Sequence, residues 1–438
     1  MAQSVIERSN DSDRVEGKPL FRDPSLWIAL LGTLSARLLF MLNWFTIWRD
    51  EGWSGHMKYD VSVWQAFWQT IQEGKIPYVE FSREYPVGAG VFYWMLSSFV
   101  RPDDEQNVYL VHFAVMAAVD LVNVALFYSL ARNINPRWAL AATFLFALNL
   151  TAVVLGPVRF ESILVTTLLV GYQLHLRDRT LLATAVWSLG TGIKWYPMFL
   201  VAAQEVKILF VDRRRSHLWR AAFVFLLVQV LLNGPFLVGS WIKNGHVDFW
   251  LETYKHHANR GLSADTVLGV AEMWFGRIRW ERYAAHISLF LIAAAVIVRP
   301  ALSFAAKAVL IGIGFLIFNR IYSPQFNLWF YPFLILWMLR LPAKHAVWAV
   351  VVFCLIDITN VFAYPFVFTE ALDEMRRFGP MRAAKRGGFW TAVWSGSIAL
   401  RAGLLLALAV ALLRERRTRV LEPAPKPVAP LCDASSAE

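Results

Sequence analysis

A polar stretch rich in acidic and aromatic residues, between positions 49 and 106, holds the side chains best suited to chemistry. Asp60 follows Tyr59 and opens the run VSVWQAFWQTIQ, in which apolar residues recur at helical spacing. That pattern is typical of an amphipathic helix in a membrane interface, where the Asp60 carboxylate could accept a proton from a substrate hydroxyl. In the structural alternative Asp60 caps the helix by accepting bonds from free backbone amides. The two roles are compatible.

Further along the same stretch, Pro77-Tyr78 and Glu84-Tyr85-Pro86 combine turn-forming prolines with hydrogen-bonding side chains. The tyrosine rings and the glutamate carboxylate suit the flat face and hydroxyls of a sugar. We therefore predict substrate contacts for Tyr78, Glu84 and Tyr85. For Pro77 a purely structural turn is the alternative.

Two corners between apolar runs carry charges. Arg159-Phe160-Glu161 is either an internal ion pair at the mouth of two helices or a functional pair, because ionisable groups at such depths are functional candidates. Lys194 ends a run in which Gly190 and Gly192 permit close helix approach, and it precedes Trp195-Tyr196-Pro197. Lys194 either extends to the membrane surface or binds a lipid-linked phosphate.

Further cations follow towards the C-terminus. Arg320 lies in FNRIYSPQ, with Ser323 and Gln325 as neutral donors close by. In the stretch 243–283, the run YKHHANRG brings His257 and Arg260 together ahead of a glycine turn. No acidic partner stands at ligand spacing there, so we expect phosphate or substrate contacts and no metal. We also expect no cofactor, since the chain has no Walker loop, no GxGxxG and no HExxH.

The composition places these motifs in a membrane protein. Of 438 residues, 57% are hydrophobic and only 17% are charged, and the mean hydropathy is +0.44. The net charge of +11 comes largely from Lys and Arg at the ends of apolar runs, as membrane anchoring requires. This distribution lacks a basic face with stacking aromatics, so no nucleic-acid partner is expected. Cys354 and Cys432 indicate neither a disulfide framework nor a metal site.

Apolar runs predict an all-α polytopic protein with about 12 transmembrane helices, since a span needs about 20 residues. The predicted spans lie near 26–48, 107–131, 137–156, 160–176, 179–193, 195–211, 217–242, 284–299, 302–318, 326–340, 344–366 and 389–413. They form one domain, 25–413, between disordered cytoplasmic tails at 1–24 and 414–438.

The basic linkers set the expected orientation in the cytoplasmic membrane. They are all cytoplasmic if the short run 86–100 lies along the surface or re-enters. The loops 49–106 and 243–283 and both charged corners then share the extracytoplasmic face. The linker 375–388 does not fit this rule, because it falls outside despite five Lys and Arg. Either it binds an anion or the number of spans near the end differs.

In order and spacing, these motifs resemble those of the GT-C class of integral-membrane glycosyltransferases. The most similar branch is the bacterial polyprenol-phosphate-mannose-dependent mannosyltransferases. The resemblance covers residues 26 to about 340 and rests on Asp60 heading an aromatic helix, Gly74-x-x-Pro77-Tyr78, Tyr85-Pro86, Arg159-Phe160-Glu161, Lys194-x-Tyr196-Pro197 and Ser323-Pro324-Gln325. The family's YPP appears here as Tyr85-Pro86-Val87, and its Arg-aromatic-Asp ends here in Glu161.

This resemblance implies a GT-C fold with interfacial helices in a long first outer loop. It also implies inverting transfer of a sugar, such as mannose or arabinose, from a polyprenyl-phosphate donor to a glycan, glycolipid or protein hydroxyl. Asp60 takes the acceptor proton. We expect Lys194, Arg320, His257 and Arg260 to stabilise the departing phosphate, and the substrate contacts to come from Tyr78, Glu84, Tyr85, Arg159, Glu161, Tyr196, Ser323 and Gln325.

Two other functions fit the same residues. A transporter or flippase of a lipid-linked or small anionic substrate needs outer cations and intramembrane polar groups, for which the chain offers Arg37, His112, Asp120 and Asp357. A lipid-binding assembly subunit without activity is the third alternative. Asp60 separates the three, because only sugar transfer requires its carboxylate.

Overall fold

The computed structural model describes residues 19–48, 54–276, 283–299, 302–380 and 388–414. Across these ranges the regular secondary structure is helical, apart from one isolated bridge between Pro77 and Phe81. Residues 1–18 and 415–438 of the predicted tails, and 381–387 of the basic linker, lie outside the described chain. The all-α membrane protein predicted from composition is confirmed at this level.

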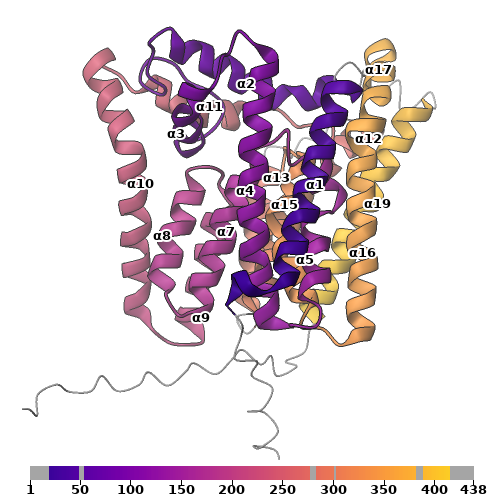
Figure 1. Ribbon diagram of the computed structural model, residues 1–438. Helices are drawn as coiled ribbons and strands as arrows, with labels where there is room; N and C mark the ends of the chain where they lie inside the picture. The colour runs from indigo at the N-terminus through magenta and orange to yellow at the C-terminus, as the bar shows by residue number, and fades with distance from the viewer. Residues whose placement is uncertain (1–18, 49–53, 277–282, 300–301, 381–387, 415–438) are drawn as a thin grey trace, which may run out of the picture.

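Five of the described helices are long and apolar enough to cross a membrane (Figure 1). They are α1 (Pro24–Thr46), α4 (Glu105–Ile134), α10 (Arg215–Asn244), α19 (Phe389–Arg414), and the run from α16 (Ala343–Val361) through a π-helical turn, η6 (Phe362–Val367), into α17 (Phe368–Phe378). Large apolar side chains point outward from them, among them Leu39, Leu231 and Val351. Such a surface is stable only against lipid or another apolar partner.

The described chain begins within the predicted N-terminal tail. Leu20–Arg22 forms a 3₁₀ turn, and Asp23 caps α1 by accepting a bond from the Ser25 amide at 3.0 Å. The same carboxylate also accepts from the Tyr128 hydroxyl at 2.7 Å and pairs with Arg132 at 3.2 Å. Residues 19–24 therefore have a defined structure, and the contacts from Tyr128 and Arg132 come from α4, which sequence proximity does not reveal.

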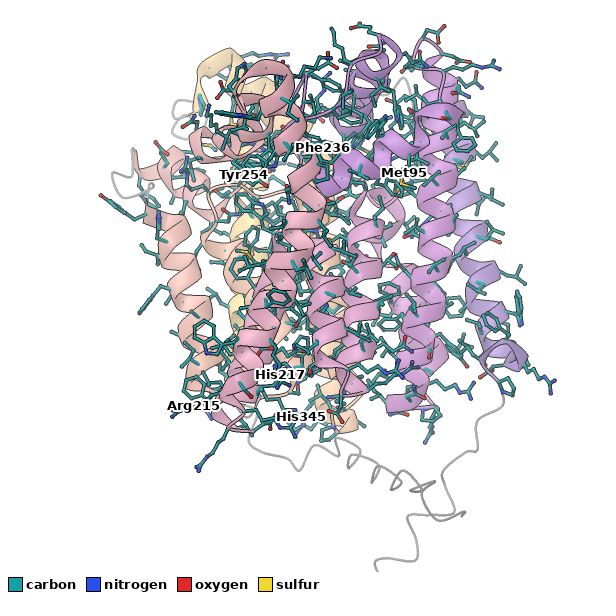
Figure 2. All side chains as sticks on the ribbon, turned by 90° about the vertical axis from the view of Figure 1, so that its left-hand side faces the viewer. Met95, Arg215, His217, Phe236, Tyr254 and His345 are labelled. Atoms are coloured by element: carbon teal, nitrogen blue, oxygen red, sulfur yellow. The ribbon has the colours of Figure 1, made fainter. Side chains whose placement is uncertain are left out.

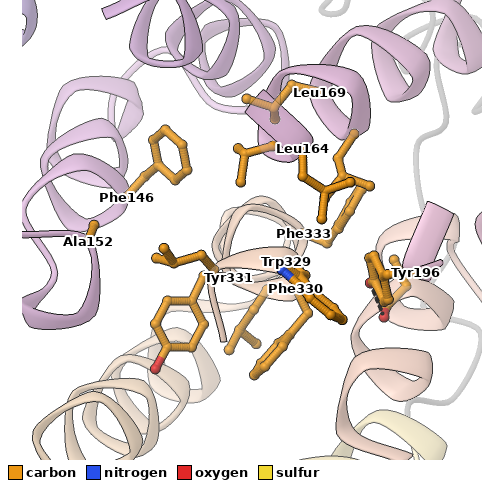
Figure 3. Packing of buried hydrophobic residues seen from close by; sticks show 14 of the residues in the cluster. Phe146, Ala152, Leu164, Leu169, Tyr196, Trp329, Phe330, Tyr331 and Phe333 are labelled. Carbon is orange, nitrogen blue, oxygen red and sulfur yellow. Dashed lines mark hydrogen bonds between the residues drawn. The ribbon is translucent and has the colours of Figure 1, made fainter. Parts of the chain in front are cut away.

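The remaining predicted spans form shorter helices. They are α5 (Ala139–Ala147), α6 (Leu150–Val154), α7 (Glu161–Leu176), α8 (Thr180–Thr191), α9 (Tyr196–Phe210), α13 (Ala284–Val298), α14 (Phe304–Phe318) and α15 (Asn327–Met338). Every residue of α15 is buried, and Figure 3 shows its aromatic side chains packed between Phe146 and Tyr196. The total of twelve spans stays a prediction, because these helices are too short to count as spans on their own.

Helices at one end of the bundle, the upper end in Figure 1, form a group that we call the cap layer: α2 (Ser54–Gln72), α3 (Val87–Leu96) and α11 (Asp248–Asn259). With the turn Ser97–Phe99, α3 is too short to cross, in line with a surface or re-entrant segment at 86–100. Figure 2 shows Tyr254 of α11 at one end and Arg215 and His345 at the opposite end. The remaining short helix, α12 (Val267–Phe275), follows α11.

The helix predicted around Asp60 is present, but it begins earlier than expected. Because α2 starts at Ser54, Asp60 lies in its second turn and is not the N-cap. Met57, Val61 and Trp64 on the same face of the helix are fully buried. Asp60 therefore points into the protein with these apolar side chains, and its carboxylate must find partners there.

Candidate active site

Asp60 is buried, with 3% of its surface exposed, and its two carboxylate oxygens have different surroundings. Oδ1 lies 2.5 Å from Arg159 Nη1 and accepts a hydrogen bond from the Tyr85 hydroxyl at 3.0 Å. Oδ2 is buried and has no hydrogen-bond partner within the described chain. A buried carboxylate oxygen without a partner is unfavourable unless a ligand or water supplies a donor. One oxygen therefore fixes the orientation of Asp60, and the other is available.

Arg159 comes from the corner between α6 and α7, and it bridges two regions of the protein. Besides the contact with Asp60, its Nη2 donates to the Tyr364 hydroxyl at 3.1 Å. Tyr364 lies in the π-helical turn η6. No feature of the sequence singled out Tyr364, because it sits in an apolar run whose pattern indicates only a membrane span.

A second charged pair lies next to the first. Lys194 Nζ is 3.0 Å from Glu161 Oε1, and the Glu161 side chain is completely buried. The contact is electrostatic, since neither Glu161 oxygen has a partner in hydrogen-bond geometry within the described chain. The corner at 159–161 thus supplies one member of each pair, so a single turn of chain orients both Asp60 and Lys194.

Aromatic rings surround the Lys194 ammonium. It lies 4.6 Å from the centre of Phe160, 5.1 Å from Phe326, 5.4 Å from Tyr85 and 5.7 Å from Trp329. Rings at these distances attract a cation and exclude water, which strengthens any charge interaction in the site. These rings come from separate segments. The loop that carries Tyr85 and the corners before α7, α9 and α15 therefore converge around Lys194.

Tyr85 is held between the two pairs by its own ring contacts. Its ring stacks on Trp64 at 5.0 Å, and Trp64 stacks in turn on Tyr93 at 3.6 Å. Burial, and secondarily the Asp60 carboxylate, raises the pKa of Tyr85 well above its usual value of 10. The hydroxyl therefore keeps its proton and acts as a donor to Asp60.

The glutamate of the same loop is tied down by α11. The Glu84 carbonyl accepts a bond from His257 Nε2 at 2.6 Å, and the Glu84 carboxylate lies 3.2 Å from His256 Nε2. Burial is the main cause that lowers the pKa of His257 to about 4. A neutral imidazole that donates to a backbone carbonyl is a poor phosphate ligand. His257 thus stabilises the Glu84–Tyr85 turn through its bond to the Glu84 carbonyl.

The other predicted cations lie near this support. The His257 ring lies 5.8 Å from Trp195, the neighbour of Lys194. Arg260 follows α11, and Arg320 donates to its backbone carbonyl in a close contact. The predicted phosphate-binding residues are therefore gathered on one side of the molecule, although only Lys194 directly adjoins the Asp60 pair.

Four predicted substrate contacts have structural surroundings of different kinds. Tyr78 is buried and donates to the carbonyl of Tyr85 at 2.8 Å, and Tyr196 is buried and donates to that of Ala308 at 2.8 Å (Figure 3). Both hydroxyls hold the fold together. Gln325, in contrast, is 3% exposed with its Oε1 lacking a partner in the described chain. Ser323 precedes it in the same corner and is partly exposed.

The intramembrane groups considered for transport are engaged with one another or with backbone. Arg37 Nε donates to Asp120 at 2.7 Å. Asp357 accepts from the Leu150 amide at 2.6 Å and from the Thr151 hydroxyl at 2.6 Å. His112 lies 3.3 Å from the Tyr93 hydroxyl. These contacts are the structural partners that buried polar groups need.

Over the described ranges, no three His, Cys, Asp or Glu side chains gather closely enough to hold a metal ion. What the site offers is a fixed carboxylate with one available oxygen beside a cation in an aromatic enclosure. That set can accept a proton and attract a neighbouring anion. Comparison with protein-family models finds no matching family, and comparison with curated proteins finds no significant relative.

Proposed function

We propose that this protein is an inverting glycosyltransferase of the GT-C type. It moves a sugar, with mannose as the first candidate, from a polyprenyl-phosphate donor to a glycan, glycolipid or protein hydroxyl outside the cytoplasmic membrane. The observation that carries the proposal is the buried Asp60 carboxylate, with Oδ1 held by Arg159 and Tyr85 and Oδ2 without a partner in the described chain.

The transfer step is a single displacement. The acceptor hydroxyl gives its proton to Asp60 Oδ2 while its oxygen forms a bond to the anomeric carbon of the donor. The bond between that carbon and the phosphate oxygen breaks, and the electron pair leaves with the polyprenyl phosphate. Attack from the face opposite the leaving group inverts the anomeric configuration. Arg159 keeps the carboxylate oriented throughout, which reduces the cost of positioning.

Lys194 is the nearest candidate to receive the departing phosphate. Its ammonium lies against Glu161, and the surrounding rings shield it from water. An incoming phosphate would compete with Glu161 for this ammonium. Helix α7 begins at Glu161, and α9 begins at Tyr196, two residues after Lys194. The N-terminal amides of both helices favour a nearby negative charge.

The transporter alternative is less well supported. It needs intramembrane charges that change partners during transport, whereas Arg37, Asp120 and Asp357 have close internal partners that explain their presence. The Asp60 site also lies beside the cap layer, where a substrate hydroxyl and a lipid-linked phosphate could meet. Sugar transfer uses this arrangement directly.

The test is sugar transfer by the purified full-length protein in nanodiscs. Polyprenyl-phosphate mannose and polyprenyl-phosphate arabinose are supplied separately, with crude membrane glycolipids as acceptors. Asp60→Asn keeps the shape of the side chain but removes its basicity, so we expect transfer to fall by about 10²- to 10⁴-fold while donor binding persists. Asp103→Asn changes an exposed carboxylate and is the matched control, with transfer unchanged.

Equal transfer by wild type and Asp60→Asn would remove Asp60 from the mechanism. Absence of transfer with both donors, together with donor movement across a sealed vesicle membrane, would instead identify a flippase.

A further inference from the structure

A cavity of about 330 Å³ lies beside α17, away from the aromatic enclosure of Lys194. Its walls include the apolar side chains of Phe368, Leu372 and Met375, and the polar groups of Ser263, Asp265 and Arg376. This volume is within the range of small-molecule sites. No residue of this lining belongs to the candidate active site described above.

Tyr364 links this cavity to Asp60. Its hydroxyl accepts the bond from Arg159, the same arginine that holds the Asp60 carboxylate. On the other side, the Tyr364 ring lies 5.5 Å from that of Phe368, which lines the cavity. Asp60 and Asp265 are both within electrostatic range of Tyr364. Tyr364 therefore lies between Phe368 on the cavity wall and Arg159, which holds Asp60.

The polar wall of the cavity is held in place by a buried arginine. Arg401 of α19 donates to the backbone carbonyl of Asp265 at 3.4 Å and to Asn360 Oδ1 at 3.0 Å, and its guanidinium lies 3.7 Å over the Tyr322 ring. The Ser263 hydroxyl donates to the Asp265 carboxylate in a close contact. These bonds fix the backbone of the segment before the cavity is occupied.

We propose that this cavity binds the saccharide part of the acceptor. A sugar ring has hydroxyls that need donors and acceptors, and one face of C–H groups that packs against apolar surface. The donors and acceptors are offered by Asp265, Ser263 and Arg376. The apolar surface comes from Phe368, Leu372 and Met375. The inference rests on the proposed function, because the acceptor is a substrate of that transfer. The saccharide could belong to a free glycan or to a glycolipid headgroup.

The experiment measures saccharide binding directly, without donor, by the full-length protein in nanodiscs. The probes are methyl α-mannoside, as a free sugar, and a mannosyl diacylglycerol incorporated in the nanodisc, each read by saturation-transfer NMR. Leu372→Trp fills the cavity, and we expect it to raise the dissociation constant at least tenfold for both probes. Asp265→Asn retains the shape of the wall and should weaken binding severalfold. Phe378→Trp, on an exposed position of the same helix, is the matched control and should bind as wild type does.

Weakened binding of both probes in the two cavity variants would support the proposal, and loss of only the lipid-linked probe would assign the site to glycolipid headgroups. Equal binding by wild type and Leu372→Trp, or no binding of either probe by wild type, would overturn it. Donor turnover is measured in the same preparations. If saccharide binding depends on Leu372 but no donor is turned over, the saccharide site is supported and the proposed transferase activity is contradicted. If donor is turned over but no saccharide binds, the transferase activity is supported and the saccharide site is contradicted.

Discussion

At the scale of single residues, the Asp60–Arg159 pair dominates the energetics of the site. Both side chains are nearly fully buried, and each lies directly against the opposite charge of the other. Removing one member of such a pair leaves an uncompensated buried charge, whereas replacing both can be nearly neutral. The pair therefore has a thermodynamic signature that is separate from any catalytic role.

Arg159→Met should destabilise the protein by about 3–5 kcal/mol, because it leaves the Asp60 carboxylate buried without its cation. The double variant Asp60→Asn/Arg159→Met should recover a large part of that loss. Denaturant unfolding of the four proteins in detergent, treated as a double-mutant cycle, measures the coupling. Purely additive effects would show that the two side chains do not stabilise one another.

We expect the buried His257 to make the free energy of unfolding depend on pH. Its pKa is lowered by burial from 6.5 to about 4 in the folded protein, so between these values the unfolded chain binds more protons. The free energy of unfolding should therefore fall as the pH is lowered from about 6.5 towards 4, with no further loss from this group below 4. Thermal unfolding across this range measures the slope.

His257→Gln should flatten that slope, because glutamine does not titrate. His345→Gln replaces an exposed histidine at the opposite end of the bundle and should leave the slope as in wild type (Figure 2). An unchanged slope in His257→Gln would assign the acid sensitivity to other groups.

At the scale of secondary-structure elements, the site depends on how closely α3 approaches the corner that carries Lys194. The Gly88 amide donates to the Gly192 carbonyl at 2.7 Å. A Cβ on Gly88 would lie 2.6 Å from that carbonyl oxygen, a distance that real Cβ atoms essentially never show. The absence of a side chain at Gly88 thus brings the cap layer onto the Lys194 corner.

Gly88→Ala should destabilise the protein by about 1–3 kcal/mol, because the methyl group forces two backbones apart. Unfolding in detergent measures this loss, and a raised KM for the donor would report the displaced Lys194 corner. Gly396→Ala in α19 is the matched control, since a methyl group added there would meet no other atom within 4 Å in the described chain. It should be neutral or slightly stabilising, as expected for alanine within a helix. Similar stability of both variants would show that the close approach is unimportant.

At the scale of the whole molecule, the ends of the bundle differ in composition. The cap layer and Tyr254 lie at one end, and Arg215, which closes the basic run Arg213-Arg214-Arg215, lies at the other (Figure 2). Short basic loops favour the cytoplasm, so the end with Arg215 should be cytoplasmic and the Asp60 site extracytoplasmic.

Cysteine labelling tests this orientation. In a background with Cys354 and Cys432 replaced by alanine, Lys255→Cys on α11 should react with a membrane-impermeant maleimide in intact cells. Arg215→Cys, which is equally exposed at the opposite end, should react only after permeabilisation. The reverse pattern would place the site in the cytoplasm and would exclude a donor supplied from outside.

The membrane class, the aromatic helix around Asp60, and the corners that carry Arg159, Glu161 and Lys194 could all be predicted from the amino-acid sequence. These properties depend on composition and on local spacing, because burial in lipid requires long apolar runs and a helix repeats its faces every few residues. Charges at the ends of such runs are conspicuous for the same reason, since each is costly within the membrane.

Which of these charges meet depends on the packing of distant segments. Three features depend on contacts between distant segments: the pairing of Asp60 with Arg159, the bond from Arg159 to Tyr364, and the bond from His257 to the Glu84 carbonyl. Many arrangements of apolar helices satisfy the same hydropathy pattern. Close packing at particular places, such as Gly88 against Gly192, selects one of them and thereby brings the polar corners together.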